Sequence, residues 1–197
     1  MRHALLTLEG PKDTRKALLA LLCIALVFFG AGLGLRDPWP ADEPRFALVA
    51  RQMVDRGQWL FPMRGGELYS DKPPLFMWAI ALCYQLLGSL RVAFLMPSLL
   101  AGLGTVALVW DLARRLWDQA TAWRAGLLLT LTLQFALQAR TAQIDALVTF
   151  FITVGLYGFM RFLLRDEGWG WYLLGWFAAG FGIITKGVGF LSLFLFV

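Results

Sequence analysis

Seven ionisable residues stand at the borders of apolar stretches or inside one of them. They are Asp42, Glu43, Asp71, Lys72, Arg140, Asp145 and Lys186. Charged side chains at membrane depth are costly and usually face a cavity or a partner group. A carboxylate in such a cavity can remove a proton or hold a cation, and lysine or arginine can neutralise an anion. Each residue therefore has a chemical interpretation beside a structural one.

Asp42 and Glu43 open a stretch with helical periodicity, residues 43–56. An acid at a helix N-terminus accepts backbone N–H bonds and suits the helix dipole, so capping is one interpretation. A second adjacent acid is more than capping requires. The alternative is a carboxylate that deprotonates an acceptor hydroxyl or binds a cation. Spacing alone leaves both interpretations open.

Asp71 and Lys72 precede Pro73 and Pro74, which stiffen the backbone and fix where the charged pair projects. Lys72 could extend to lipid head groups as an interfacial anchor. A lysine held beside an outer cavity is equally a natural partner for a phosphate or pyrophosphate anion. The residues themselves do not choose between these two roles.

Asp145 begins an apolar run, where an acid in the first helical turn is common. Lys186 lies deep in a span-like segment, and either extends outward from a helix end or supplies a second cation for a lipid phosphate. The sequence has no nucleotide-binding loop, nucleophile elbow or zinc signature, and His3 is its only histidine. Cys23 and Cys83 lie in apolar surroundings and are expected to pack rather than to bind a metal.

Composition predicts a membrane protein. Apolar residues make up 59% of the chain and charged residues only 16%, and the apolar ones gather in runs near 17–35, 92–110, 125–137, 146–160 and 171–197. Because about 18 apolar residues can span a bilayer core, we predict an all-α, polytopic membrane fold. The net charge of +5 is explained by lysine and arginine at membrane borders, so no nucleic-acid partner is expected.

The basic residues before residue 17 predict a cytoplasmic N-terminus. Residues 74–88 are the ambiguous segment, since about 15 helical residues reach only about 22 Å, short of the roughly 30 Å core. If this segment lies at the interface, five later arginines fall on the cytoplasmic side: Arg114, Arg115, Arg124, Arg161 and Arg165. The predicted spans are then 17–35, 91–112, 120–138, 145–163 and 171–190, with interfacial helices 43–56 and 74–88 in an outer loop of residues 36–90.

Under this topology all seven ionisable residues lie on the outer face. The first apolar run is predicted to be an uncleaved signal anchor, because it is longer than the hydrophobic region of a signal peptide and residues 30–34 give a weak cleavage context. The chain stops at Val197 within an apolar run, from which we expect a truncated product or a fragment.

Short motifs at these residues resemble those of a known family. They are DEPRFA at 42–47, ARQM at 50–53, GQW at 57–59, GELYSDKPPL at 66–75, Arg91 with Pro97 and Ser98, ARRLW at 113–117, QIDAL at 143–147 and TKG at 185–187. Together they are similar to bacterial GT-C glycosyltransferases, the relatives of dolichyl-phosphate-mannose protein mannosyltransferases and of the aminoarabinose transferase that modifies lipid A. The resemblance covers residues 17–197.

The resemblance implies a GT-C helical bundle and a reaction. The family's catalytic acid in the first outer loop corresponds to Asp42, with Glu43 beside it, and a second acid corresponds to Asp145. The lysine of the Lys-Pro-Pro motif corresponds to Lys72, which would lie near the donor phosphate. A polyprenyl phosphate leaving group needs cations at the interface, for which Lys186 and Arg140 are further candidates beside Lys72.

The implied partners are a sugar donor linked through phosphate to a polyprenyl lipid, a lipid or protein acceptor, and membrane lipids of the bacterial inner membrane. These residues identify no particular cofactor, and a divalent cation on Asp42 or Asp71 is an open alternative. Family members are longer, so we expect this chain alone to be inactive. A transporter or a non-catalytic membrane assembly protein is the competing hypothesis, although neither repeated hydropathy units nor broken helices are apparent.

Overall fold

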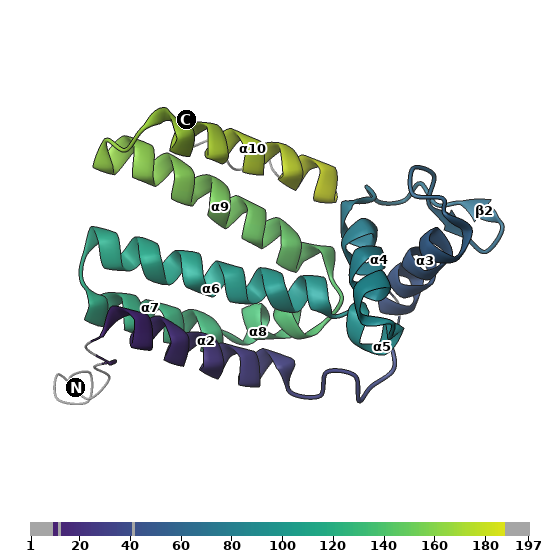
Figure 1. The fold of residues 1–197 in the computed structure, drawn as a ribbon, viewed down its shortest axis with the longest axis horizontal. Helices are drawn as coiled ribbons and strands as arrows, with labels where there is room; N and C mark the ends of the chain where they lie inside the picture. Colours follow the sequence, from purple (N-terminus) through teal and green to yellow (C-terminus); the bar gives the residue numbers. More distant parts are fainter. Residues whose placement is uncertain (1–9, 12, 41, 188–197) are drawn as a thin grey trace.

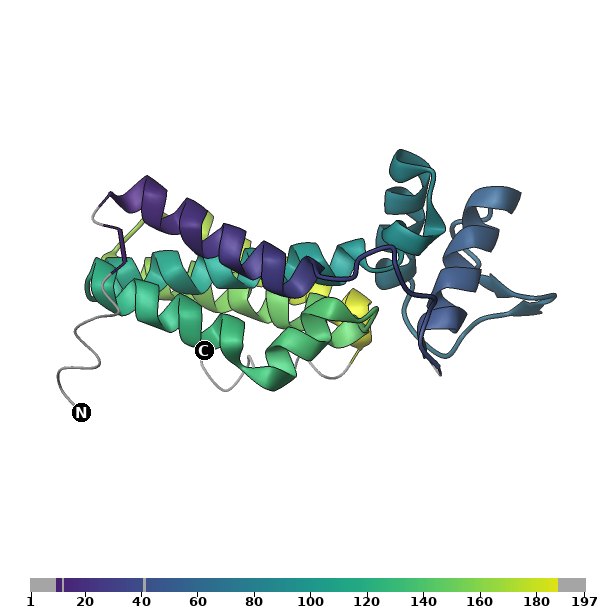
Figure 2. The same cartoon turned by 90° about the horizontal axis from the view of Figure 1, so that it is seen from below.

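The computed structural model describes residues 10–11, 13–40 and 42–187. Six helices form an elongated bundle (Figures 1 and 2). They are α2 (Thr14–Gly30), α6 (Met96–Leu116), α7 (Gln119–Leu131), α8 (Leu133–Arg140), α9 (Ile144–Arg165) and α10 (Trp169–Lys186). The chain reverses direction from one pass to the next, and α7 and α8 follow one another in a single pass. The chain therefore passes repeatedly between two ends of one bundle, with its polar connections at those ends.

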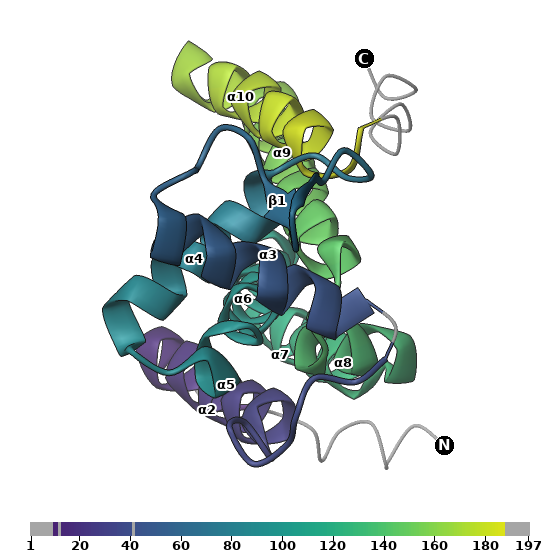
Figure 3. The same ribbon diagram turned by 90° about the vertical axis from the view of Figure 1, so that its right-hand side faces the viewer.

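A second group of elements covers one end of the bundle, at the right of Figure 1 and facing the viewer in Figure 3. It contains α3 (Asp42–Arg56), the strands β1 (Met63–Arg64) and β2 (Glu67–Leu68), α4 (Leu75–Leu87) and α5 (Leu90–Ala93). The helices α3 and α4 occupy the stretches 43–56 and 74–88 that were expected to be interfacial. Neither runs along the bundle, and their depth relative to a bilayer stays a prediction.

A shared apolar core holds α3 against α4. Phe46 on α3 meets Phe76 on α4 edge to face, with ring centroids 5.5 Å apart. Val49, Met53 and Ile80 are buried in the same cluster, which also includes Ile144 at the start of α9. Because apolar burial stabilises by about 25 cal/mol per Å², this cluster fixes α3 relative to the bundle.

Within the bundle, small residues let helices approach closely. A Cβ on Gly158 of α9 would lie 2.5 Å from the Trp171 carbonyl oxygen of α10, so only glycine fits there. A Cβ on Gly126 of α7 would likewise meet the Leu21 side chain of α2 at 2.3 Å. Such close helix contacts at small residues are typical of membrane helix packing.

Several helices differ in extent from the predicted spans. The first helix ends at Gly30 rather than at residue 35, and Gly32 and Gly34 follow with positive φ angles, which end a helix readily. The stretch 91–112 is divided into α5 and α6, and α6 continues to Leu116. The stretch 120–138 is divided at Thr132, whose backbone is extended and whose hydroxyl donates to the Leu128 carbonyl.

A short antiparallel hairpin also departs from the purely helical prediction. Met63 pairs with Leu68 and Arg64 with Glu67. The turn between them contains Gly65 at φ 70°, a conformation that glycine adopts without strain. The Gly65-Gly66 pair is a common hairpin signal, but two residues per strand are too few for an alternating pattern to be seen in the sequence.

Two helical stretches among the described residues are long and apolar enough to cross a membrane, Leu90–Leu116 and Ile144–Arg165. The stretch Leu90–Leu116 joins α5 and α6. The predicted span 171–190 begins within α10, but residues 188–190 lie outside the described part of the chain. The number of five spans therefore stays a prediction.

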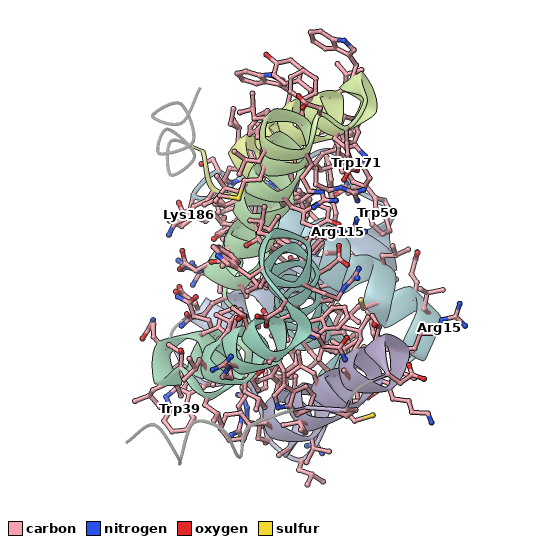
Figure 4. All side chains as sticks on the ribbon, turned by 90° about the vertical axis from the view of Figure 1, so that its left-hand side faces the viewer. Arg15, Trp39, Trp59, Arg115, Trp171 and Lys186 are labelled. Carbon is pink, nitrogen blue, oxygen red and sulfur yellow. The ribbon has the colours of Figure 1, made fainter. Side chains whose placement is uncertain are left out.

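The end of the bundle opposite α3 carries an ionic network. Asp111 binds Arg114 at 2.8 Å and Arg115 at 2.5 Å, and it accepts the Tyr157 hydroxyl at 2.5 Å. Figure 4 views this end, where Arg115 and Trp171 are labelled. The network joins α6 to α9 at the end where the arginines were predicted to gather.

Candidate active site

Four of the seven predicted residues line one cavity between the α3–α4 group and the bundle. This charged cavity has a volume of about 170 Å³ and is lined by Asp42, Phe46, Lys72, Gln143, Ile144, Asp145 and Lys186. Its charged residues come from four places in the chain: the start of α3, the segment before α4, the start of α9 and the end of α10. The fold thus brings together side chains up to 144 positions apart in the sequence.

Asp42 is the first residue of α3, and Arg45 one turn later binds its carboxylate. Arg45 also lies 3.7 Å from the Asp71 carboxylate, measured from Nη1 to Oδ2. The Asp42 side chain remains 53% exposed, so a molecule in the cavity can reach it. Arg45 therefore orients Asp42 without covering it.

Lys72 is exposed and makes no ion pair or hydrogen bond with any other described residue. The prolines after it occupy the turn that leads into α4, which begins at Leu75. Because the prolines restrict the backbone beside it, Lys72 is held at the cavity with its ammonium group available to an anion.

Asp145 and Lys186, which both line the cavity, form an ion pair. Asp145 is in the first turn of α9 and Lys186 is the last residue of α10, and each side chain is 41% exposed. The pair ties the two helix ends together on one wall. Lys186 is thus less free than Lys72 to neutralise a bound anion.

Glu43 lies outside the charged cavity, although it was predicted beside Asp42 in the catalytic centre. Its side chain is buried, and Arg36 donates from Nη1 to Oε2 at 2.5 Å and from Nη2 to Oε1 at 2.8 Å. The backbone N–H groups of Trp39 and Ala142 donate to the same carboxylate at 2.6 and 2.7 Å. These four bonds join the segment before α3 to the segment before α9.

The electrostatics of Glu43 match this structural role. Burial raises the pKa of its carboxyl, but the hydrogen bonds from Arg36 and the two backbone N–H groups more than offset this, and the pKa is lowered overall. The pairing with Glu43 also raises the pKa of Arg36. A carboxylate held ionised with both oxygens occupied is suited to positioning its neighbours.

Arg140 is not brought to the charged cavity. Its Nη2 donates to the Ala31 carbonyl at 3.0 Å, and its own carbonyl accepts from Arg36 at 3.1 Å. Arg140 lines a different cavity, together with Phe29 of α2 and Leu35 in the segment that follows it. The predicted contact of Arg140 with the same phosphate as Lys72 therefore has no support in this geometry.

The two residues considered for a divalent cation, Asp42 and Asp71, share the guanidinium of Arg45. A cation between them would have to displace Arg45. Among the residues that the structure describes, no three His, Cys, Asp or Glu side chains form a group that could hold a metal ion. These side chains do not fit a metal in the present arrangement.

Sequence reasoning missed three residues at or near the site. Arg45 could have been found, because positions three apart on a helix are neighbours and Asp42 precedes it by three. Gln143 lines the charged cavity as a neighbour of Asp145. No pattern in the sequence indicates that Arg36 binds Glu43, since Arg36 lies outside any helix or strand.

Known proteins share sequence similarity with most of this chain. The family model described as dolichyl-phosphate-mannose-protein mannosyltransferase matches residues 71–197. An undecaprenyl phosphate-alpha-4-amino-4-deoxy-L-arabinose arabinosyl transferase of Aeromonas salmonicida is 34% identical over 176 residues, covering 85% of this chain and 31% of the relative. A similarly named enzyme of Pseudomonas fluorescens is 33% identical over 180 residues, covering 88% and 33%.

The crystal structure of ArnT from Cupriavidus metallidurans bound to undecaprenyl phosphate has the same fold. It superposes with a TM-score of 0.79 at 25% identity, over 92% of this chain and 34% of that one. The chain thus spans about a third of the length of these relatives. Its helical bundle is that of a GT-C membrane protein.

Proposed function

The chain belongs to the dolichyl-phosphate-mannose-protein mannosyltransferase family, and on this premise we propose that it forms the catalytic part of a membrane glycosyltransferase. The donor is a sugar linked through phosphate to a polyprenyl lipid, and the acceptor is a lipid or a protein. The charged cavity is the transfer site. We place it at the periplasmic face of a bacterial inner membrane, with the N-terminus in the cytoplasm.

The observation that carries this proposal is the convergence of Asp42 and Lys72 on one cavity, which the Asp145–Lys186 pair also lines. Transfer from a lipid phosphate needs a group that removes the acceptor proton and a cation for the departing phosphate. Asp42 and Lys72 supply these two groups. A polyprenyl donor needs no nucleotide-binding motif, which agrees with the absence of one from the sequence.

In the proposed reaction, the acceptor oxygen attacks the anomeric carbon of the donor sugar while the bond from that carbon to the phosphate oxygen breaks. Asp42 takes the acceptor proton, and its position is set by Arg45. The phosphate leaves with the bonding electron pair, and Lys72 stabilises the charge that develops on it. Preorganised charge of this kind is usually the largest contribution to such catalysis.

The test is binding of undecaprenyl phosphate to the full chain in lipid nanodiscs. Lys72→Met keeps the apolar stem and removes the ammonium, and should weaken binding roughly tenfold to a hundredfold, since one contact to a charged group contributes about 1.5–3 kcal/mol. Lys16→Met is the matched control, because Lys16 is an exposed lysine at the opposite end of the bundle. Equal affinity of Lys72→Met and wild type would leave Lys72 as an interfacial anchor and remove the proposed donor site.

A further inference from the structure

A groove follows the exposed side of α2 and ends at a guanidinium group. This α2 groove has a volume of about 670 Å³ and is lined by Cys23, Ile24, Val27, Phe28, Ala31 and Arg140. The helix α2 lies at the edge of the bundle (Figures 1 and 2), and the Val27 side chain in the groove is 73% exposed. Arg140 is the one charged residue among the described residues that line it. The groove is therefore apolar along its length and cationic at one end.

A smaller cavity adjoins the cationic end of the groove. It is the cavity of about 170 Å³ described above for Arg140, and it shares both Ala31 and Arg140 with the groove. Arg36 also lines it, so two guanidinium groups lie close together. Within the described part of the chain, no aspartate or glutamate lines either space. The charge at this end of the groove therefore suits an anion.

Arg140 is held in place with part of its guanidinium still available. It is the exposed last residue of α8, and its Nη2 donates to the carbonyl of Ala31, the residue that follows α2. Its Nε and Nη1 have no partner, and it forms no ion pair, among the described residues. Arg36 differs, because Glu43 already binds it. A planar guanidinium with free donors on one edge is suited to a phosphate group.

The groove runs in the direction that a membrane lipid requires. Arg140 and Ala31 lie at helix ends, where charged groups meet the membrane interface, and the lining continues back along α2 to Cys23. The eight positions from Ala31 to Cys23 correspond to about 12 Å of helix. A lipid with its phosphate at the guanidinium would therefore place the first part of one acyl chain against the apolar lining.

We propose that the α2 groove is a binding site for an anionic phospholipid, whose phosphate lies on Arg140 and one of whose acyl chains follows Val27, Ile24 and Cys23. This lipid is not the sugar donor, because the donor phosphate is assigned to Lys72 and Arg140 does not line the charged cavity. A zwitterionic head group would bring a further cation to the two arginines. Phosphatidylglycerol carries a neutral glycerol there, so its net charge complements the site.

The bound lipid would stabilise the segment that leads from α2 to the charged cavity. The Arg140 carbonyl accepts from Arg36 Nη2 at 3.1 Å, and Arg36 also binds Glu43 in the first turn of α3. A lipid on Arg140 thus lies at the base of the connection between α2 and α3. Because a ligand that binds the folded state raises its stability, phosphatidylglycerol should raise the unfolding midpoint of the chain.

The experiment titrates the full chain in detergent with phosphatidylglycerol or phosphatidylcholine and counts bound lipids by native mass spectrometry. The wild type should bind phosphatidylglycerol roughly tenfold more tightly. Arg140→Met should weaken that binding about tenfold to a hundredfold, and Arg140→Lys should recover part of it. Val27→Trp, which fills the groove, should weaken it as well. The matched controls are Arg56→Met at the exposed end of α3 and Leu128→Trp, at a 69% exposed position of α7; neither residue lines the groove.

The rise in unfolding midpoint on adding phosphatidylglycerol gives a second measurement, referred to each variant's own midpoint without lipid. Equal phosphatidylglycerol affinity in the wild type and Arg140→Met would overturn the proposal, as would equal affinity of the wild type for the two phospholipids. Loss of undecaprenyl phosphate binding in Arg140→Met, with phosphatidylglycerol binding intact, would assign Arg140 to the donor instead. The site is independent of the proposed function: Lys72→Met should leave phosphatidylglycerol binding unchanged whether or not it affects undecaprenyl phosphate.

Discussion

Replacing Glu43 by glutamine tests whether the buried carboxylate positions the site or takes part in the chemistry. Glu43→Gln is almost isosteric but turns one oxygen into an amide donor, which faces N–H groups that already donate. At least one of the two hydrogen bonds from Arg36 is lost, and the other then goes to a neutral amide oxygen instead of a carboxylate. Hydrogen bonds to charged groups contribute about 1.5–3 kcal/mol each. Arg36 is 30% exposed and can partly rehydrate, which favours the lower part of the range.

We therefore expect Glu43→Gln to lower stability by about 2–4 kcal/mol. For a chain of this size that corresponds to a midpoint lower by roughly 5–15 °C. Transfer should fall as well, because the Ala142 N–H bond holds the segment that leads to Asp145. The assay compares thermal unfolding in detergent with sugar transfer by the full-length protein. Asp55→Asn is the control, since it breaks an exposed ion pair with Arg51 on the same helix and should cost less than about 1 kcal/mol.

A double variant gives the positioning argument a sharper test. Removing both partners, in Arg36→Met with Glu43→Gln, leaves no unpaired buried charge, so its destabilisation should be smaller than the sum of the single changes by about 1–3 kcal/mol. A normal unfolding midpoint in Glu43→Gln combined with a large loss of transfer would refute the reasoning. That result would indicate that Glu43 takes part in the chemical step.

Lowering the pH should protonate Glu43 and remove its contribution to stability. The lowered pKa of Glu43 means that its contribution to stability is complete above the unfolded value of about 4.3 and is lost as the pH falls through the lower folded value. Glu43→Gln should therefore lose less stability than the wild type between neutral pH and the acid range below 4.3. Parallel acid titrations of the two forms would contradict the assignment of this loss to Glu43.

Three further outcomes are expected. In the full-length protein, Asp42→Asn should reduce transfer on the order of 10²-fold or more with an unchanged unfolding midpoint, because the amide can still bond but cannot take a proton. Near-normal transfer would move the base to Asp145. Single cysteines at 42, 72 and 145, in a chain without Cys23 and Cys83, should react with an impermeant thiol reagent from outside, and labelling of 145 only from the cytoplasm would break the site. Gly158→Ala should lower the free energy of unfolding by about 1–3 kcal/mol, because its Cβ would meet the Trp171 carbonyl oxygen at 2.5 Å. Gly180→Ala should be tolerated, since a Cβ there has nothing within 4 Å, and equal unfolding midpoints for the two variants would contradict this packing.

Local patterns made much of the helical framework predictable. The periodicity of 43–56 corresponds to α3, and the proline pair before Leu75 with Gly88 after Leu87 marks both ends of α4. The helix interruptions were less visible. Thr132 divides a continuous apolar stretch, and an extended backbone at one threonine follows from tertiary context that hydropathy does not contain.

The candidate site divides in the same way. Lys72 and Asp42 could be singled out in the sequence from their residue types and their neighbouring residues, and the fold brings them to one cavity. The separation of Asp42 from Glu43 could not be predicted, because adjacent helical residues point about 100° apart and nothing in the sequence says which one faces the core. Arg36 binds Glu43 and holds it outside the charged cavity, and Arg36 itself lies outside any helix or strand.

Both ends of the bundle carry paired charges, and Lys72 differs in this respect from the other cation of the charged cavity, Lys186. At the end opposite α3, Arg115 binds Asp111, and Arg161 and Arg165 lie against Glu167, so that each of these cations has a carboxylate partner. At the end beside α3, Lys72 has no such partner within the described chain, although it lines a cavity with two carboxylates. Lys186 already has Asp145 as its partner, whereas the exposed ammonium group of Lys72 can gain one from an incoming anion. The unpaired lysine is therefore what a phosphate-bearing donor would satisfy.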